Sequence, residues 1–194
     1  EVKIIHNAID LDKFKFDPEA RKKLRKELDI KEKTVVIGHV GRFVKQKNHD
    51  FLIDVFNEYH AKNPDSKLLL IGTGPLEEKT KAKVEKLNLT DFVLFLGQRE
   101  DTNKLYSVMD VFCLPSLYEG LPVVGIEAQA AGLLCIVSNK VSKETKLTEN
   151  FIFLPLDMKK YTKKIYTKRI KPGSSLLKKY NIVDSVSSLE LIYL

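Results

Sequence analysis

The sequence predicts an α/β fold in which an open, parallel, Rossmann-like sheet carries helices on both faces. Three observations support this fold class. Between residues 34 and 155, short apolar runs alternate with helical patterns. Most of these runs are continuously apolar, as in strands that helices bury on both faces. Repeated strand–helix units favour parallel pairing with right-handed crossovers.

The expected elements follow one another in a regular order. Six apolar runs, at residues 34–40, 67–72, 92–97, 111–115, 133–138 and 151–155, are the expected strands. The expected helices among them span residues 48–61, 75–87, 101–108, 123–131 and 140–148. Ahead of them, the first 33 residues indicate a short strand, a turn and a charged helix, which Asp17 and Pro18 begin in the usual way. Gly132 fits a helix C-terminal cap.

Bulk composition sets limits on the class of protein. The 194 residues, 43% of them hydrophobic, suffice for one domain with a substantial core, or for one domain and a fraction. No apolar run approaches the ~20 residues that a membrane span needs. Cys113 and Cys135 lie inside apolar runs, as small buried residues do, and no signal-peptide pattern is present, so we expect a cytoplasmic protein. The four histidines lack metal-ligand spacing, and we expect no metal.

The net charge of +7 favours acidic ligands or surfaces. Much of the excess lies between Lys159 and Lys171, where basic residues occur without an acid. A solvated, lysine-rich helix face is the favoured interpretation of this segment. Peripheral contact with an anionic membrane, at the inner face, is the alternative. No nucleic-acid-binding motif accompanies the segment, so we expect no nucleic-acid partner.

Two glutamates stand out in the stretch P-S-L-Y-E-G-L-P-V-V-G-I-E-A. Glu119 is expected on the loop after a buried strand, and Glu127 in the first turns of the next helix. Open α/β sheets bind ligands at this edge, where strands end and helices begin. Carboxylates there suit hydroxyl-rich ligands, because each accepts two or more hydrogen bonds. The alternative, one loop glutamate and one solvated helix glutamate, carries about equal weight on spacing alone.

Two cations follow the first central strand. Arg42 and Lys47 are expected at the carboxyl end of the sheet, beside the helix that starts near residue 48. A planar guanidinium and a lysine ammonium together suit a diphosphate, although solvated surface cations are the commoner case. Gly72 and Gly74 begin like a dinucleotide fingerprint, but Glu77 stands where the third glycine belongs. A nicotinamide site is therefore not expected, and a tight turn is the simpler interpretation.

Taken together and in this order, the motifs are similar to the nucleotide-sugar-binding C-terminal half of family-4 retaining glycosyltransferases, which have the GT-B fold. The matched positions are Asn7, Asp10, Phe14, Gly41, Arg42, Lys47, Gly72, Gly74, Pro75, Phe95 to Gly97, Asp110, Pro115, Ser116, Glu119, Gly120 and Glu127. The match implies a donor-binding domain over residues 1–155. Residues 156–194 would then be lysine-rich helices that pack on the same domain or on an N-terminal domain that this chain lacks.

The resemblance also implies roles for individual residues. Arg42 and Lys47 would hold the donor diphosphate and stabilise it as it departs, so that neither metal nor cofactor is needed. Glu119 would be the catalytic contact to the donor sugar, near the reacting carbon. Glu127 would accept hydrogen bonds from the ribose hydroxyls.

The remaining residue implication concerns the nucleotide base, which the backbone of Gln98 and Arg99 would frame.

The resemblance implies that the chain is the donor-binding part of a hexosyltransferase-type enzyme in bacterial polysaccharide or glycolipid synthesis. Without its N-terminal acceptor domain, it would have little transfer activity. A non-catalytic nucleotide-sugar-binding module, an epimerase of the same fold and a basic nucleic-acid-associated domain are the alternatives. A final helix with an apolar stripe at Ile182, Val186 and Leu189 is expected to lack its natural partner here.

Overall fold

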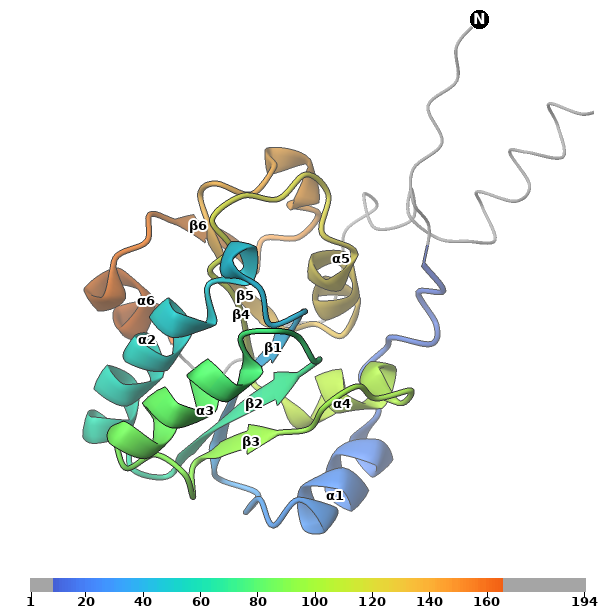
Figure 1. Ribbon diagram of the computed structural model, residues 1–194. Helices are drawn as coiled ribbons and strands as arrows, with labels where there is room; N and C mark the ends of the chain where they lie inside the picture. The colour runs from blue at the N-terminus through green and yellow to red at the C-terminus, as the bar shows by residue number, and fades with distance from the viewer. Residues whose placement is uncertain (1–8, 166–194) are drawn as a thin grey trace, which may run out of the picture.

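Six parallel strands form the centre of the structure, a computed structural model that describes residues 9–165 (Figure 1). The strands are β1 (Val35–Val40), β2 (Ser66–Ile71), β3 (Val93–Phe95), β4 (Val111–Leu114), β5 (Leu134–Ser138) and β6 (Phe151–Leu154). Their order in the sheet is β3-β2-β1-β4-β5-β6, and every neighbouring pair is parallel. The structure therefore confirms the predicted parallel α/β fold and all six predicted strands.

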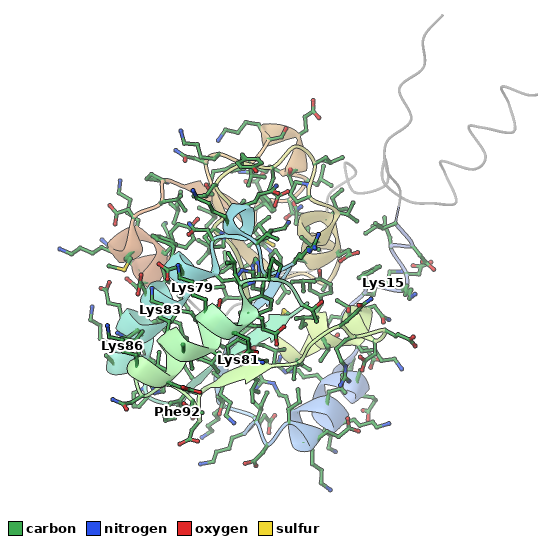
Figure 2. All side chains as sticks on the ribbon, in the orientation of Figure 1. Lys15, Lys79, Lys81, Lys83, Lys86 and Phe92 are labelled. Carbon is green, nitrogen blue, oxygen red and sulfur yellow. The ribbon has the colours of Figure 1, made fainter. Side chains whose placement is uncertain are left out.

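Helices cover both faces of this sheet (Figure 1). They are α1 (Pro18–Glu27), α2 (His49–Lys62), α3 (Glu77–Lys86), α4 (Thr102–Val108), α5 (Val123–Ala130) and α6 (Met158–Lys164), with 3-10 turns η1 (Lys45–Lys47) and η2 (Lys143–Thr145). Buried side chains of α1, α4 and α5 pack in one core cluster, and those of α2, α3 and α6 in another. On α3, for example, Val84 is buried while Lys79 and Lys86 are exposed (Figure 2).

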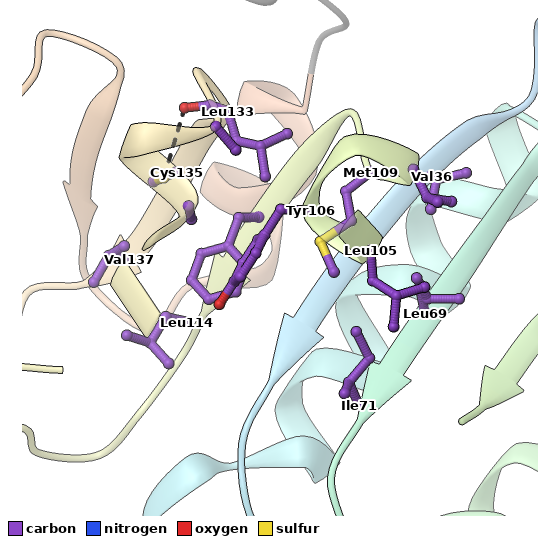
Figure 3. Close-up of a cluster of buried hydrophobic side chains, with 14 of the residues drawn as sticks. Val36, Leu69, Ile71, Leu105, Tyr106, Met109, Leu114, Leu133, Cys135 and Val137 are labelled. Atoms are coloured by element: carbon purple, nitrogen blue, oxygen red, sulfur yellow. Dashed lines mark hydrogen bonds between the residues drawn. The ribbon is translucent and has the colours of Figure 1, made fainter. Parts of the chain in front are cut away.

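The core on the α4 side joins strands β1, β2, β4, β5 and β6 to the helices α1, α4 and α5. Figure 3 shows part of this cluster. Leu69 and Leu105 are fully buried there, as is Cys135. Gly38 in β1 leaves room for the Met109 side chain, since a Cβ at this position would lie 2.1 Å from the Met109 sulfur and the methionine would have to move. Burial of aliphatic side chains at this density contributes roughly 1.5–3 kcal/mol for each of the larger ones.

A buried charge cluster attaches α1 to the sheet. Asp110, just before β4, accepts one hydrogen bond from Arg21 and one from Arg25, each at 2.7 Å. The same carboxylate accepts the backbone N–H of Val36 at 2.8 Å. Burial lowers the pKa of Arg25, and the Asp110 charge opposes that shift. Asp110, one of the matched motif positions, is thus a structural link between α1, β1 and β4.

The helix predicted over residues 140–148 is wrong. The structure has only the short turn η2 there, between β5 and β6. The reason is Gln129, which is 1% exposed and satisfies backbone groups of this segment. Its Oε1 accepts from the N–H groups of Leu147 and Thr148, and its Nε2 donates to the Thr145 carbonyl. A buried amide side chain has therefore replaced the helical hydrogen bonds.

Two further predictions lie outside the described residues: the strand at the N-terminus and the helix over residues 181–194. Within the described part, α6 packs on α2. Tyr161 of α6 is fully buried, and its ring centroid lies 5.2 Å from that of Phe51. The beginning of the lysine-rich segment after residue 155 therefore packs on the sheet domain.

The sheet has a topological switch between β1 and β4, where the strand order reverses direction. The chain first builds β1, β2 and β3 towards one edge, and then returns to place β4, β5 and β6 towards the other. The loops that leave the carboxyl ends of β1 and β4 lie at this switch point, where open α/β sheets bind ligands. The predicted cations and glutamates follow these two strands.

Candidate functional site

The loops after β1, β2 and β3 are bound to each other through their backbones. Phe43 N–H donates to the Thr73 carbonyl, and Gly72 N–H donates to the Gly97 carbonyl. Gly72 has a φ of +131°, and a Cβ there would lie 2.3 Å from the Gly41 carbonyl oxygen. A Cβ on Gly74 would lie 2.7 Å from the backbone of Phe43. The two glycines therefore allow close approach of the loops, which agrees with the tight-turn interpretation.

Lys47 and Glu119 form an ion pair between the loop after β1 and the loop after β4. The Lys47 Nζ atom lies 2.5 Å from Glu119 Oε1, and the two side chains are only 16% and 11% exposed. The Ser116 hydroxyl donates to the same carboxylate oxygen at 3.0 Å. Sequence reasoning expected both residues at this edge but assigned them to different parts of a ligand. In the structure they contact each other.

The backbone around this pair is equally well held. Leu117 N–H donates to the Gln46 carbonyl at 2.8 Å, so η1 and the loop after β4 are joined directly. Asn48 adopts a left-handed conformation, and its side-chain amide donates to the Pro115 carbonyl at 3.1 Å. The positions of Lys47 and Glu119 therefore depend on backbone contacts and not only on their own attraction.

Arg42 lies in a different environment. Its side chain is exposed, and it makes no hydrogen bond or ion pair within residues 9–165. It lines a cleft of about 280 Å³ over the carboxyl ends of β1 and β2. The lining residues are Val40, Gly41, Arg42, Ile71, Gly72, Thr73, Gln98, Arg99 and Thr102. The structure thus brings Arg42 together with Gln98 and Arg99, the two residues whose backbone was expected to frame a base.

Arg99 itself is anchored beside this cleft. Its guanidinium makes two hydrogen bonds of 2.7 Å to the carboxylate of Asp101. These bonds raise the pKa of Arg99 and lower that of Asp101. The Arg99 carbonyl also accepts from the Thr102 hydroxyl at 2.8 Å. The backbone of the loop after β3 is therefore fixed in position, as recognition by backbone groups requires.

Glu127, on α5, is held by a tyrosine that sequence reasoning missed. The Tyr106 hydroxyl donates to Glu127 Oε2 at 2.7 Å. Burial raises the pKa of Glu127, although the hydrogen bond from Tyr106 opposes that shift. Tyr106 and Thr102 are four residues apart on α4 and share a face of that helix. Since Thr102 lines the cleft, α4 connects the cleft to Glu127. No local pattern around Tyr106 signalled this contact.

Two buried histidines lie beneath the loop after β1. His39 Nδ1 lies 2.8 Å from the Cys113 carbonyl oxygen and therefore donates to it, because a carbonyl only accepts. Burial lowers the pKa of His39 to about 4. Burial, with smaller effects of His39 and Lys47, lowers the pKa of His49 to about 2. Both imidazoles are therefore neutral near pH 7.

No group of three or more His, Cys, Asp or Glu side chains among residues 9–165 could hold a metal ion. None of the helices in that range is both long enough and apolar enough to cross a membrane.

Comparison with known proteins gives one family match. The family described as "Glycosyl transferases group 1" matches residues 20–164. The protein EpsF of Bacillus subtilis strain 168 is 39% identical over 143 residues, which cover 74% of this chain and 37% of that protein. An Escherichia coli enzyme, named UDP-Gal:alpha-D-GlcNAc-diphosphoundecaprenol alpha-1,3-galactosyltransferase, is 38% identical over 144 residues, which cover 72% of this chain and 37% of the enzyme.

Solved structures share the fold. The crystal structure of Anabaena Alr3699/HepE, in complex with UDP and glucose, superposes with a TM-score of 0.83. It is 21% identical in sequence, and the alignment covers 98% of this chain and 56% of that one. This chain therefore spans little more than a third of the length of the two relatives above, and about half of the solved protein.

Proposed function

We propose, from the premise that this chain belongs to the group 1 glycosyl transferases, that it is the nucleotide-sugar-binding domain of a retaining glycosyltransferase. The observation that carries the proposal is the position of Arg42, Lys47 and Glu119 on the loops that leave the carboxyl ends of β1 and β4, the two strands of the switch point. Arg42 lines the cleft there, and Lys47 is paired with Glu119. Open α/β sheets bind nucleotides at such a switch point. The likeness to a fold that binds UDP in Alr3699/HepE supports the same placement.

The donor diphosphate is assigned to Arg42 and Lys47. Arg42 offers an unused guanidinium at the rim of the cleft, and Lys47 lies beyond it on η1. When the bond between the sugar and the diphosphate breaks, negative charge grows on the departing phosphate. Fixed cations stabilise that charge more in the transition state than in the ground state, which is what accelerates the reaction. Arg42 and Lys47 supply this charge in place of a metal, and no cofactor is required.

Glu119 changes partner in this proposal. Before the donor binds, its carboxylate is neutralised by Lys47. A bound diphosphate competes for the lysine, and Glu119 becomes free to accept hydrogen bonds from the donor sugar. A carboxylate near the anomeric carbon also stabilises the positive charge that develops there. The ion pair therefore keeps both groups at the reaction centre, with their charges compensated, until the donor arrives.

Glu127 is assigned to the ribose hydroxyls. Tyr106 fixes one of its oxygens, and Oε1 has no hydrogen-bond partner within residues 9–165. The base then lies along the fixed backbone of Gln98 and Arg99, in the cleft that also holds Arg42. Retention of anomeric configuration is supported by the name of the E. coli relative, an alpha-1,3-galactosyltransferase that uses UDP-Gal.

The acceptor side of the reaction is assigned to a domain outside this chain. The relatives are much longer than the matched region, and the match covers 37% of each. An N-terminal domain would close over the carboxyl edge and complete the active site. Synthesis of a bacterial polysaccharide or glycolipid is the proposed process, since the E. coli relative is named for a lipid-linked acceptor.

We place the protein in the cytoplasm, with peripheral contact to the anionic inner membrane face. The contact surface is α6, where Lys159, Lys160, Lys163 and Lys164 are all exposed. Met158, on the same helix, is 41% exposed and adds an apolar side chain to the lysines. Lysines near an anionic bilayer contribute about 1 kcal/mol each to binding.

The experiment that tests the donor-binding function is a calorimetric titration of the 194-residue chain with UDP, GDP and ADP. We expect saturable binding of at least one of them, and tighter binding of that diphosphate than of inorganic pyrophosphate. Binding of none at millimolar concentration would overturn the proposal. Transfer by a longer protein that contains this chain then separates an enzyme from a non-catalytic binding module.

A further inference from the structure

The two strands at the switch point separate before they end. The last paired positions of β1 and β4 are Gly38 and Phe112. On their outer sides, β1 stays paired with β2 up to Val40, and β4 stays paired with β5 up to Leu114. Backbone pairing between β1 and β4 therefore stops two residues before the carboxyl end of either strand. The loops that carry Lys47 and Glu119 leave the sheet just beyond this point.

A histidine side chain joins the two strands where their backbone pairing stops. His39, the next residue of β1, donates from Nδ1 to the carbonyl oxygen of Cys113, the next residue of β4, at 2.8 Å. The imidazole is fully buried, and its plane stands at 83° to the ring of His49, with 4.7 Å between the centroids. The side chain thus satisfies a backbone carbonyl in place of a strand neighbour. His39 therefore fixes the position of β1 relative to β4 at the edge that carries the candidate site.

The opposite edge of the imidazole lies beside the stem of Lys47, with Gly41 between them. A Cβ on Gly41 would lie 2.9 Å from His39 Nε2. The same Cβ would lie 3.2 Å from Cδ and 3.4 Å from Cε of Lys47. Because Gly41 has no side chain, the imidazole and the lysine stem both fit against its backbone. Any movement of the His39 ring towards the loop would therefore be felt by Lys47.

The imidazole presents a lone pair to this loop and no charge. Because Nδ1 carries the proton, Nε2 is the unprotonated nitrogen, and it has no hydrogen-bond partner within residues 9–165. Burial lowers the pKa of His39 to about 4, and the charge of Lys47 contributes to that shift. The negative end of a neutral ring attracts a nearby ammonium group, whereas an imidazolium would repel it. His39 can therefore support the stem of Lys47 without repelling its charge.

We propose that His39 is a positioning residue for donor binding. Its bond to Cys113 fixes β1 relative to β4, and its contact at Gly41 fixes the stem of Lys47, so that the ammonium group stands beside Glu119 and is available to a diphosphate. His39 itself does not touch the ligand, since its ring is fully buried beneath the loop. The effect on the diphosphate rests on the proposed function. The support of Lys47 by His39 does not, because it is a contact within the ligand-free protein.

Two variants of nearly equal size test the bond to Cys113. In His39→Asn, the side-chain Nδ2 takes the place of the imidazole Nδ1 and can still donate to the carbonyl. In His39→Leu, a methyl group stands there and the bond is lost. Calorimetric titration of the 194-residue chain should show binding of UDP and of inorganic pyrophosphate about tenfold weaker in His39→Leu, and within about threefold of the parent in His39→Asn. Equal losses in the two variants would overturn the role of the bond.

A double-mutant cycle tests whether His39 acts through Lys47. Once Lys47→Met has removed the ammonium group, His39→Leu should weaken UDP binding by less than about twofold further. The control for lost stability is Val84→Ala, which deletes buried atoms of α3 and none from the cleft, and which should change UDP affinity by less than about twofold. A tenfold loss by His39→Leu in both backgrounds, or the same loss in Val84→Ala, would overturn the proposal, because His39 would then act through the stability of the domain.

Nitrogen NMR of the His39 ring is a readout that needs neither a His39 variant nor a ligand. At pH 7 we expect the neutral form protonated at Nδ1, and an Nε2 signal that shifts in Lys47→Met and not in the control Lys45→Met, which removes an exposed lysine of the same loop. Pyrophosphate should shift this signal in the parent and not in Lys47→Met. An Nε2 signal that Lys47→Met leaves in place would overturn the support of Lys47 by His39. Failure of UDP and pyrophosphate to bind the parent would instead overturn the donor site, and the ligand-free spectra would still decide the contact between His39 and Lys47.

Discussion

The Lys47 ammonium is 2.5 Å from the Glu119 carboxylate, so a cation of the loop after β1 and an acid of the loop after β4 neutralise each other. These residues are 72 positions apart in sequence, and both side chains are largely buried. A diphosphate that approaches Lys47 must compete with Glu119. Removal of Lys47 should therefore weaken donor binding, and removal of the Glu119 charge should strengthen it.

We expect Lys47→Met to weaken UDP binding by ~1.5–3 kcal/mol, because a charge-assisted hydrogen bond to the diphosphate is lost. Glu119→Gln should strengthen UDP binding by ~1 kcal/mol, about fivefold, because the competing carboxylate is gone. Calorimetric titration measures both. A Glu119→Gln chain that binds UDP as weakly as Lys47→Met would mean that Glu119 contacts the nucleotide itself and does not compete for the lysine.

The proposed roles of Arg42 and Glu127 can be distinguished with two ligands, UDP and inorganic pyrophosphate. Arg42→Ala is expected to weaken UDP and inorganic pyrophosphate alike, by ~1.5–3 kcal/mol, since its proposed partner is the diphosphate. Glu127→Gln should weaken UDP and leave pyrophosphate unchanged, since its proposed partner is the ribose. The two titrations on each variant decide this directly. Equal losses of both ligands in Glu127→Gln would remove the ribose assignment.

The raised pKa of Glu127 leads to a pH dependence. The carboxylate must be ionised to accept hydrogen bonds from both ribose hydroxyls, and burial makes ionisation harder. UDP affinity should therefore fall as the pH is lowered, starting at a higher pH than for an ordinary glutamate. Tyr106→Phe removes the hydrogen bond that opposes the shift, so the pKa of Glu127 rises further and the loss of UDP affinity moves to higher pH.

Pyrophosphate is the control for this experiment, because the phosphates of the ligand titrate as well. The ratio of UDP to pyrophosphate affinity isolates the ribose contact. An affinity ratio that is independent of pH in the parent chain would contradict a ribose-binding carboxylate at Glu127. So would a fall in the ratio that occurs at the same pH in the parent chain and in Tyr106→Phe.

Asp110 should be essential for stability. Asp110→Asn leaves the guanidinium groups of Arg21 and Arg25 without their anion, and Arg25 is 3% exposed. Breaking one side of a buried ion pair costs ~3–5 kcal/mol of unfolding free energy. Urea unfolding measures this loss. The control is Asp12→Asn, which breaks the exposed pair with Lys15 and should cost less than ~1 kcal/mol. A similar small cost at both sites would contradict the proposed link between α1 and the sheet.

The sequence allowed prediction of the sheet and of the edge that carries the candidate site, for a physical reason. The strands are continuously apolar, and parallel topology places all their carboxyl ends, with Arg42, Lys47 and Glu119, at one edge. What could not be predicted depends on side-chain geometry across long sequence separations. The contact of Lys47 with Glu119, the hydroxyl of Tyr106 on Glu127, and the pairing of α1 arginines with Asp110 are of this kind.

The wrong helix over residues 140–148 has the same origin. Its local pattern was compatible with a helix, but a single buried amide, Gln129, binds the backbone of that segment from another element. Tertiary hydrogen bonds to a buried side chain outweighed local propensity.

The lysines of α6 lead to a prediction about membranes. Substitution of Lys159, Lys160, Lys163 and Lys164 by Gln should abolish most binding to vesicles that contain anionic phosphatidylglycerol, because each lysine contributes about 1 kcal/mol at such a surface. Binding of the parent chain should fall as salt is raised, since the attraction is screened. Cosedimentation with vesicles, with and without the anionic lipid, measures this effect.

The control must have the same net charge as the α6 variant, because a chain with a charge of +7 is attracted weakly to any anionic surface. A variant with Gln at Lys22, Lys23, Lys26 and Lys33 removes four exposed lysines from α1 and the segment that follows it. If α6 is the contact surface, this control keeps most of the binding that the α6 variant loses. Equal losses in the two variants would mean that net charge alone drives the attraction, and α6 would then be an ordinary solvated helix face.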